Sequence, residues 1–173
     1  MKYHYIAIST RKKKLKTLLT SGTSVTRQIK LMEGFKMVII KKATQAQTIT
    51  AIKSGDFSVI DTINRKSEKE AMEIFKAVSD GAIKLAYWDM PSVKRRDGKR
   101  SIMRYALHRS TKNVDCLQLS CMELIGSEII PTSDRQFNIK DDYDRREFFR
   151  SLPAVTKMTL NNRARLFISW LPG

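Results

Sequence analysis

One segment, residues 67–88, constrains the fold of this chain more than any other. Its apolar side chains recur at helical spacing and form one stripe: Ala71, Ile74, Phe75 and Val78. Ser67 and Glu70 have the spacing of a capping box that begins a helix, and Asp80-Gly81 has the form of a helix stop. Residues 83–88 then alternate between two faces, as a strand does. The segment therefore predicts a helix followed by a strand.

The residues before this segment predict a similar arrangement. Alternation over residues 3–9 predicts an opening strand, and leucines at helical spacing soon after it predict a short helix. Residues 35–40 and 56–63 are the next two strand candidates. Strand, helix and strand ahead of a second crossover predict a ferredoxin-like domain of mixed α/β (α+β) class over residues 1–90.

A change in composition at Pro91 predicts a second domain. Residues 94–100 form a basic turn with Asp97-Gly98 as the tip of a hairpin. The rest of the chain predicts a strand over residues 104–109, a helix over 113–125 and a loop from residue 131. A second helix over residues 141–152 and a closing strand over 163–170 follow. We expect these elements to form a smaller, basic RNA-binding domain over residues 91–173.

The composition indicates a folded chain with an anionic partner. Hydrophobic residues make up 42% of the 173 residues, which is typical of a globular protein. Lys and Arg number 33 against 17 Asp and Glu, so the net charge is +16. Because such an excess repels itself in a compact fold, it predicts a polyanionic partner, nucleic acid first and an anionic membrane surface second. No apolar run approaches the ~20 residues that cross a bilayer, so we expect a cytoplasmic protein.

Few residues are arranged for catalysis or metal binding. The sequence has no Gly-rich phosphate loop, serine nucleophile elbow or zinc-protease helix. Cys116 and Cys121 lack the further ligands of a metal site, and we expect two reduced thiols. The aspartates near residue 141 favour helix capping over chelation. We therefore predict no metal and no cofactor. Metal-free RNA cleavage stays open, because it needs only a base and cations around the phosphate.

Basic clusters are the strongest functional signal. Arginine can contact phosphates or guanine edges through two hydrogen bonds at once. His4 lies mid-strand, where we expect a structural role, whereas His108 fits either a binding role or a plain surface position. The predicted contacts lie on the basic turn and around the strand after it: Arg95, Arg96, Lys99, Arg100, Arg104, His108, Arg109 and Lys112.

Several motifs, in order along the chain, point to one family. The chain opens with the strand HYIAI at residues 4–8, and its second crossover ends at Pro91. Residues 105–113 read YALHRSTKN, a strand that ends in an arginine and is soon followed by a lysine. Near the C-terminus, LPAVT and RLFI occupy residues 152–156 and 165–168. This layout resembles the endoribonuclease that processes CRISPR RNA in type I-F systems.

The resemblance implies a protein that binds the hairpin of a CRISPR repeat and, if active, processes pre-crRNA. Such a protein remains on the crRNA 3′ hairpin beside the other subunits of a type I-F surveillance complex. The resemblance places Arg109 at a base-reading position with Thr111 beside it, and Thr159 in a hydroxyl-rich loop. It also implies an arginine-rich helix that follows Lys112 and enters the major groove of the RNA.

The chain departs from the family at two functional positions. The family's catalytic histidine lies on the first helix, but no histidine occurs between His4 and His108. The segment after Lys112 holds no arginine before Arg135. RNA binding is therefore better supported than cleavage, and no general base is assigned.

Two other functions account for the charge without the motifs. One is a non-enzymatic, sequence-tolerant nucleic-acid-binding protein of phage or plasmid origin. The other is a basic protein that docks on an acidic partner or on anionic lipid, although the sequence lacks a long amphipathic basic helix for a membrane surface.

Overall fold

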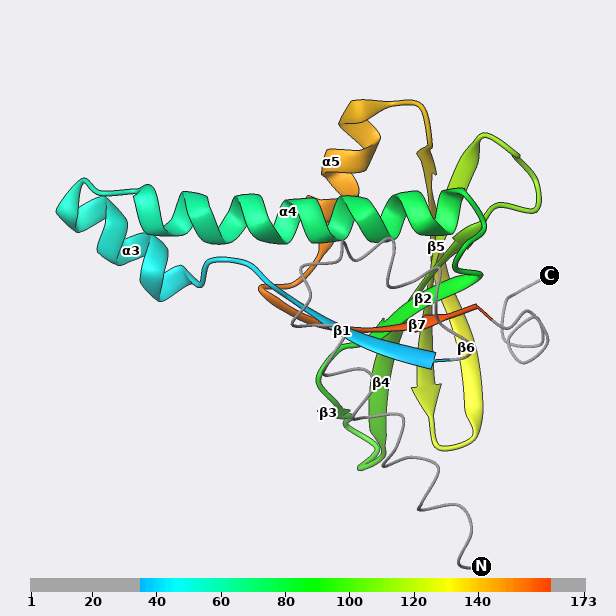
Figure 1. Cartoon of the computed structure of the whole chain (residues 1–173). Helices are drawn as coiled ribbons and strands as arrows, with labels where there is room; N and C mark the ends of the chain where they lie inside the picture. The colour runs from blue at the N-terminus through cyan, green and yellow to red at the C-terminus, as the bar shows by residue number, and fades with distance from the viewer. Residues whose placement is uncertain (1–34, 163–173) are drawn as a thin grey trace, which may run out of the picture.

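Seven strands and three helices make up the part of the chain that the structure describes. The computed structural model describes residues 35–162 (Figure 1). In chain order, its elements are β1 (Phe35–Lys41), α3 (Gln45–Ser54), α4 (Ser58–Ser79), β2 (Leu85–Asp89), β3 (Val93–Lys94), β4 (Arg100–Arg109), β5 (Cys116–Ile125), β6 (Glu128–Asn138), α5 (Asp142–Ser151) and β7 (Val155–Asn161).

The seven strands form one sheet. Its order is β1-β7-β2-β4-β5-β6, with the short β3 paired to β4, and every described pairing is antiparallel. Because β7 pairs with both β1 and β2, those two strands run parallel to each other and are joined through α3 and α4. The expected α+β class is confirmed. The expected domain boundary at residue 90 falls between β2 and β3, inside this sheet.

One face of the sheet packs against α4 and α5. Phe148 of α5 lies at the centre of an aromatic cluster, with its ring centroid 5.4 Å from Phe75 of α4, 5.9 Å from Phe137 of β6 and 6.3 Å from Trp88 of β2. All four side chains are buried. Figure 1 shows α3 and the first turns of α4 extending beyond the sheet, so only the later part of α4 covers it. None of the described helices is long and apolar enough to span a membrane.

The expected strand over residues 56–63 is wrong, because α4 begins at Ser58. Val59 and Ile60 favour a strand by propensity, but Ile60 belongs to a buried helical stripe that continues through Ala71 to Val78. The expected helix start at Ser67 is also wrong, because that residue lies inside α4. Its side chain is buried, and its hydroxyl donates to the carbonyl of Lys41 at the end of β1. The serine of the capping-box pattern therefore joins α4 to β1 and does not begin a helix.

The expected helix over residues 113–125 is wrong, because this segment holds β5. The strand lies between β4 and β6 and is buried on both faces, for example at Leu117 and Met122. A strand buried on both faces loses its alternation, so its apolar residues also fit a helical spacing. The loop expected from Pro131 onwards is also wrong, because Pro131 and the residues after it belong to β6, which runs to Asn138. A register shift opposite Cys121 and Met122 accommodates the proline in this strand.

The other predicted elements within the described range are present. Strands β1, β2 and β4 cover the segments predicted near residues 35–40, 83–88 and 104–109. Helix α4 ends at the predicted stop, where Gly81 has φ 76°. Helix α5 is capped by Asp141, whose carboxylate accepts from the backbone N–H of Tyr143 at 2.8 Å. The predicted strands over residues 3–9 and 163–170 and the first helix lie outside the described residues.

Candidate nucleic-acid interface

A basic hairpin joins β3 to β4. We use this name for residues 93–100, whose exposed cations are Lys94, Arg95, Arg96, Lys99 and Arg100. The turn is closed by backbone bonds from Arg95 N to Lys99 O at 2.8 Å and from Gly98 N to Arg95 O at 3.1 Å. Gly98 has φ 82°, the left-handed conformation that favours glycine, so the predicted Asp97-Gly98 tip is confirmed. In Figure 1 the hairpin projects at the same end of the sheet as the β5–β6 turn.

Most cations of the basic hairpin lack acidic partners within the described part of the chain. Arg95 is the exception, because its guanidinium contacts Glu123 on β5 at 2.9 Å and Asp97 at 3.6 Å. This pair fixes the base of the hairpin against the sheet. Among residues 35–162, no acidic side chain pairs with the four others: Lys94, Arg96, Lys99 and Arg100. Four like charges held this close repel one another, and an anion that binds between them relieves the repulsion.

Arg104 is predicted as a contact, but the sheet already engages its side chain. Its Nε donates to Asp89 Oδ1 at 2.6 Å and its Nη2 to Asp89 Oδ2 at 2.8 Å. The guanidinium also lies 4.8 Å from the ring centroid of Tyr87. The hydrogen bonds to Asp89 raise the pKa of Arg104 further above its ordinary value. This two-bond pair links β2 to β4 and leaves Arg104 poorly placed to exchange its partner for a phosphate.

His108 is buried rather than at the surface. Its Nδ1 lies 2.9 Å from the carbonyl of Arg109 and its Nε2 lies 3.1 Å from Ser120 Oγ. Because a carbonyl only accepts, Nδ1 carries the hydrogen, and Nε2 of the neutral ring accepts from the serine hydroxyl. Burial lowers the pKa of His108, although the Arg109 carbonyl and the charge of Asp134 partly oppose this. His108 thus has a structural position, and the part of the chain described here offers no exposed histidine as a general base.

The remaining predicted contacts lie far from the basic hairpin. Arg109, Thr111 and Lys112 are exposed at the opposite end of β4. At about 3.3 Å per residue, the length of β4 separates Arg109 from Arg100 by about 30 Å. Thr159 is half-buried in β7, opposite Tyr87. The structure therefore divides the predicted site between two ends of one strand. Lys94 was not among the predicted contacts, but it is one of the exposed cations of the basic hairpin.

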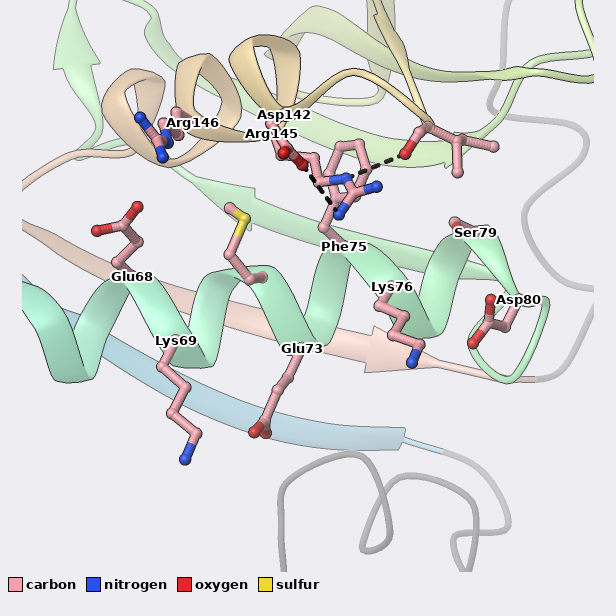
Figure 2. Close-up of a pocket in the computed structure, with 12 residues that line it drawn as sticks. Glu68, Lys69, Glu73, Phe75, Lys76, Ser79, Asp80, Asp142, Arg145 and Arg146 are labelled. Atoms are coloured by element: carbon pink, nitrogen blue, oxygen red, sulfur yellow. Dashed lines mark hydrogen bonds and ion pairs between the residues drawn. The ribbon is translucent and has the colours of Figure 1, made fainter.

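A groove between α4 and α5 contrasts with the basic hairpin. It has a volume of about 720 Å³, and Figure 2 shows Phe75 inside it with Arg145 reaching across from α5. Arg145 donates to the carbonyl of Ile139 at 3.0 Å and pairs with Asp142 at 3.4 Å. The charged residues that line the groove are four acidic and four basic ones: Glu68, Glu73, Asp80, Asp142, Lys69, Lys76, Arg145 and Arg146. A groove with no excess of one sign does not select a polyanion.

Cysteines and acidic residues add no metal site in the described range. Cys116 and Cys121 are both buried and unpaired with each other, as two free thiols were expected to be. Within residues 35–162, no group of three or more His, Cys, Asp or Glu side chains could hold a metal ion.

The sequence matches no protein-family model, no curated protein and no solved structure. The resemblance to the type I-F endoribonuclease therefore stays a prediction. One element it implies is different here, since the segment after Lys112 leads into strand β5 rather than into a helix.

Proposed function

We propose that this protein binds nucleic acid and that the basic hairpin contacts the phosphate backbone. One observation carries this proposal: Lys94, Arg96, Lys99 and Arg100 project together without an acidic partner among residues 35–162, while Arg95 anchors the hairpin through Glu123. Exposed cations suit phosphates, which carry charge but no sequence information. The charge excess of the whole chain supports the same partner.

A narrower form of the proposal names the ligand as RNA, the hairpin of a CRISPR repeat. In this form the protein stays on the crRNA 3′ hairpin with other subunits of a surveillance complex. The order of the sequence motifs supports it, as does the exposure of Arg109 at the end of β4. Cleavage is not part of the proposal, because no residue between 35 and 162 is placed as a general base.

A second candidate is sequence-tolerant binding of nucleic acid. Two of the predicted nucleic-acid contacts support it, because their side chains already bind partners within the sheet: Arg104 binds Asp89, and His108 binds Ser120. If these two side chains read no bases, the hairpin cations supply most of the affinity, and such contacts are insensitive to sequence.

Salt dependence of binding tests the general proposal. Replacement of Lys94, Arg96, Lys99 and Arg100 by Gln should weaken binding and flatten the slope of log K against log salt by about 3, because each lost phosphate contact removes ~0.7–0.9. Fluorescence anisotropy with labelled RNA and DNA measures this slope.

A matched variant controls for net charge. Lys53, Arg65, Lys66 and Arg146 are exposed, lie on helices and make no ion pair with a described residue, so their replacement by Gln removes the same charge elsewhere. This control should lower the slope far less. Equal losses in the two variants would mean that only net charge matters, and the hairpin would not be the site.

Competition between ligands separates the two candidates. A repeat hairpin, a scrambled hairpin, duplex DNA and single strands should be compared at one salt concentration. Preference for the repeat hairpin supports the CRISPR form. Equal affinity for the scrambled hairpin, or a preference for duplex DNA, favours sequence-tolerant binding.

A further inference from the structure

A small pocket opens on the helix-covered face of the sheet, where α5 ends. Its volume is about 290 Å³. The wall comes from Trp88 and Tyr105, which lie opposite each other on β2 and β4 and stack with ring centroids 5.6 Å apart at 11°. Leu119 and Cys121 of β5 are buried beneath it. The pocket therefore has an aromatic wall and an apolar floor.

Polar groups line the rim of this pocket. Arg135 of β6 is exposed. Its guanidinium lies 4.8 Å from the ring centroid of Phe137, and its Nη2 makes a long contact of 3.5 Å with Glu147 Oε2. A guanidinium has five N–H donors, so most of them remain available to a ligand. Ser133 and Ser151 add hydroxyl oxygens, and Ser151 already donates to the carbonyl of Phe148 at 2.6 Å, which leaves its oxygen as an acceptor. An apolar slot with donors and acceptors at one edge fits a flat heterocycle.

The pocket lies on the same face of the sheet as the residue that anchors the basic hairpin. Cys121 lines the pocket, and Glu123, two residues further along β5 and on the same face, holds Arg95 of the hairpin. Along β4, five residues separate Tyr105 from Arg100, a distance of about 17 Å. A strand whose phosphates lie on the hairpin thus has the pocket within reach of its bases.

We infer that this pocket takes one unpaired nucleobase, stacked on the half-buried ring of Tyr105, which itself stacks on the buried Trp88, with the edge of the base toward Arg135. The inference rests on the proposed function, because the hairpin supplies the backbone contacts that bring the base to the pocket. Its size is at the lower limit of small-molecule sites, which suits a single base better than a base pair. Bases of single strands commonly stack on aromatic side chains in this way.

The test compares a short oligoadenylate RNA with an abasic strand of the same length and charge. The chain has two tryptophans, so the protein used here carries Trp170→Phe, and Trp88 is then its single tryptophan. Oligoadenylate should bind roughly 5- to 150-fold more tightly than the abasic strand, the range measured for one stacked base. It should also change the fluorescence emission of Trp88, whereas the abasic strand should not.

Two single-charge variants locate the base. Arg135→Gln should abolish most of the preference for oligoadenylate. Arg150→Gln is the matched control, because Arg150 pairs with the same carboxylate, Glu147 at 2.7 Å, but does not line the pocket, and it should keep the preference.

The possible failures are distinguishable. Equal binding of both strands overturns the base pocket and leaves hairpin binding in place. A preference that survives Arg135→Gln with unchanged Trp88 emission places the base elsewhere and also overturns it. No binding of either strand overturns the proposed function together with the pocket.

Discussion

At the scale of single residues, distant partners decide what each cation does. Arg95, Arg96 and Arg104 look alike in the sequence, yet Arg95 binds Glu123, 28 residues away, and Arg104 binds Asp89, 15 residues away. Arg96 has no such partner among the described side chains. A basic run therefore predicts the sign of a surface, but not which of its members remain available to a ligand.

His108 makes a prediction about stability and pH at this same scale. Burial lowers its pKa in the folded protein, so below the ordinary value of about 6.5 the unfolded chain binds a proton that the folded chain does not. The free energy of unfolding should therefore be highest above pH ~6.5 and fall as the pH drops through this value. Urea denaturation between pH ~7.5 and pH ~5.5 measures the decline.

The variant His108→Gln isolates this effect. It should flatten the decline over that pH range, whatever it does to stability at neutral pH. His4, the other histidine, lies outside the described residues, so both proteins should carry His4→Gln. If the two pH profiles were parallel, the proton uptake would belong to other groups.

At the scale of elements, local patterns were informative where one face alone is buried. Helix α5 shows its cap and charge order in the sequence, and the β3–β4 hairpin shows its turn. Strand β5 could not be recognised, because burial of both faces removes the alternation that distinguishes a strand from a helix. The start of α4 was hidden for another reason. Val59 and Ile60 favour a strand by propensity, but Ile60 is buried as the first member of the helical stripe of α4.

Gly98 tests the conformation of the basic hairpin. Its φ is 82°, and a Cβ added there would meet no atom within 4 Å, so the only cost of a side chain is backbone strain. Gly98→Ala should therefore destabilise the hairpin by about 1–2 kcal/mol. Gly98→Asn should cost less, because asparagine tolerates the left-handed region. Amide hydrogen exchange at Arg95 and Lys99 reports the loss, and equal protection in all three proteins would contradict this turn geometry.

At the scale of the whole molecule, contacts between distant parts of the chain hold the fold together. Strand β7 inserts between β1 and β2, so the last described strand completes the sheet begun by the first. Above it, Phe148 joins α5 to α4 and to the sheet through Phe75, Phe137 and Trp88. The division of the predicted contacts between the two ends of β4 is a further result of this arrangement, because strand length separates them.

Phe148→Ala tests how α5 is held. The side chain is fully buried, so its truncation should lower the free energy of unfolding by about 3–5 kcal/mol through lost burial and a cavity. Tyr143→Ala on the same helix is the control, because Tyr143 is 63% exposed and should change stability by less than about 0.5 kcal/mol. Similar losses in the two variants, measured by urea denaturation, would show that α5 does not dock through Phe148.

The sequence by itself determined the charge of the protein, its mixed α+β class and the elements whose signals are local: the stop of α4, the turn at Gly98 and the cap of α5. Such signals depend on residues a few positions apart, so they can be seen in the linear chain. Only the tertiary structure decided that β7 lies between β1 and β2, that Asp89 and Ser120 engage Arg104 and His108, and that a pocket forms beside Trp88. Each of these depends on contacts between residues far apart in the chain, which burial and pairing create only when the whole sheet has formed.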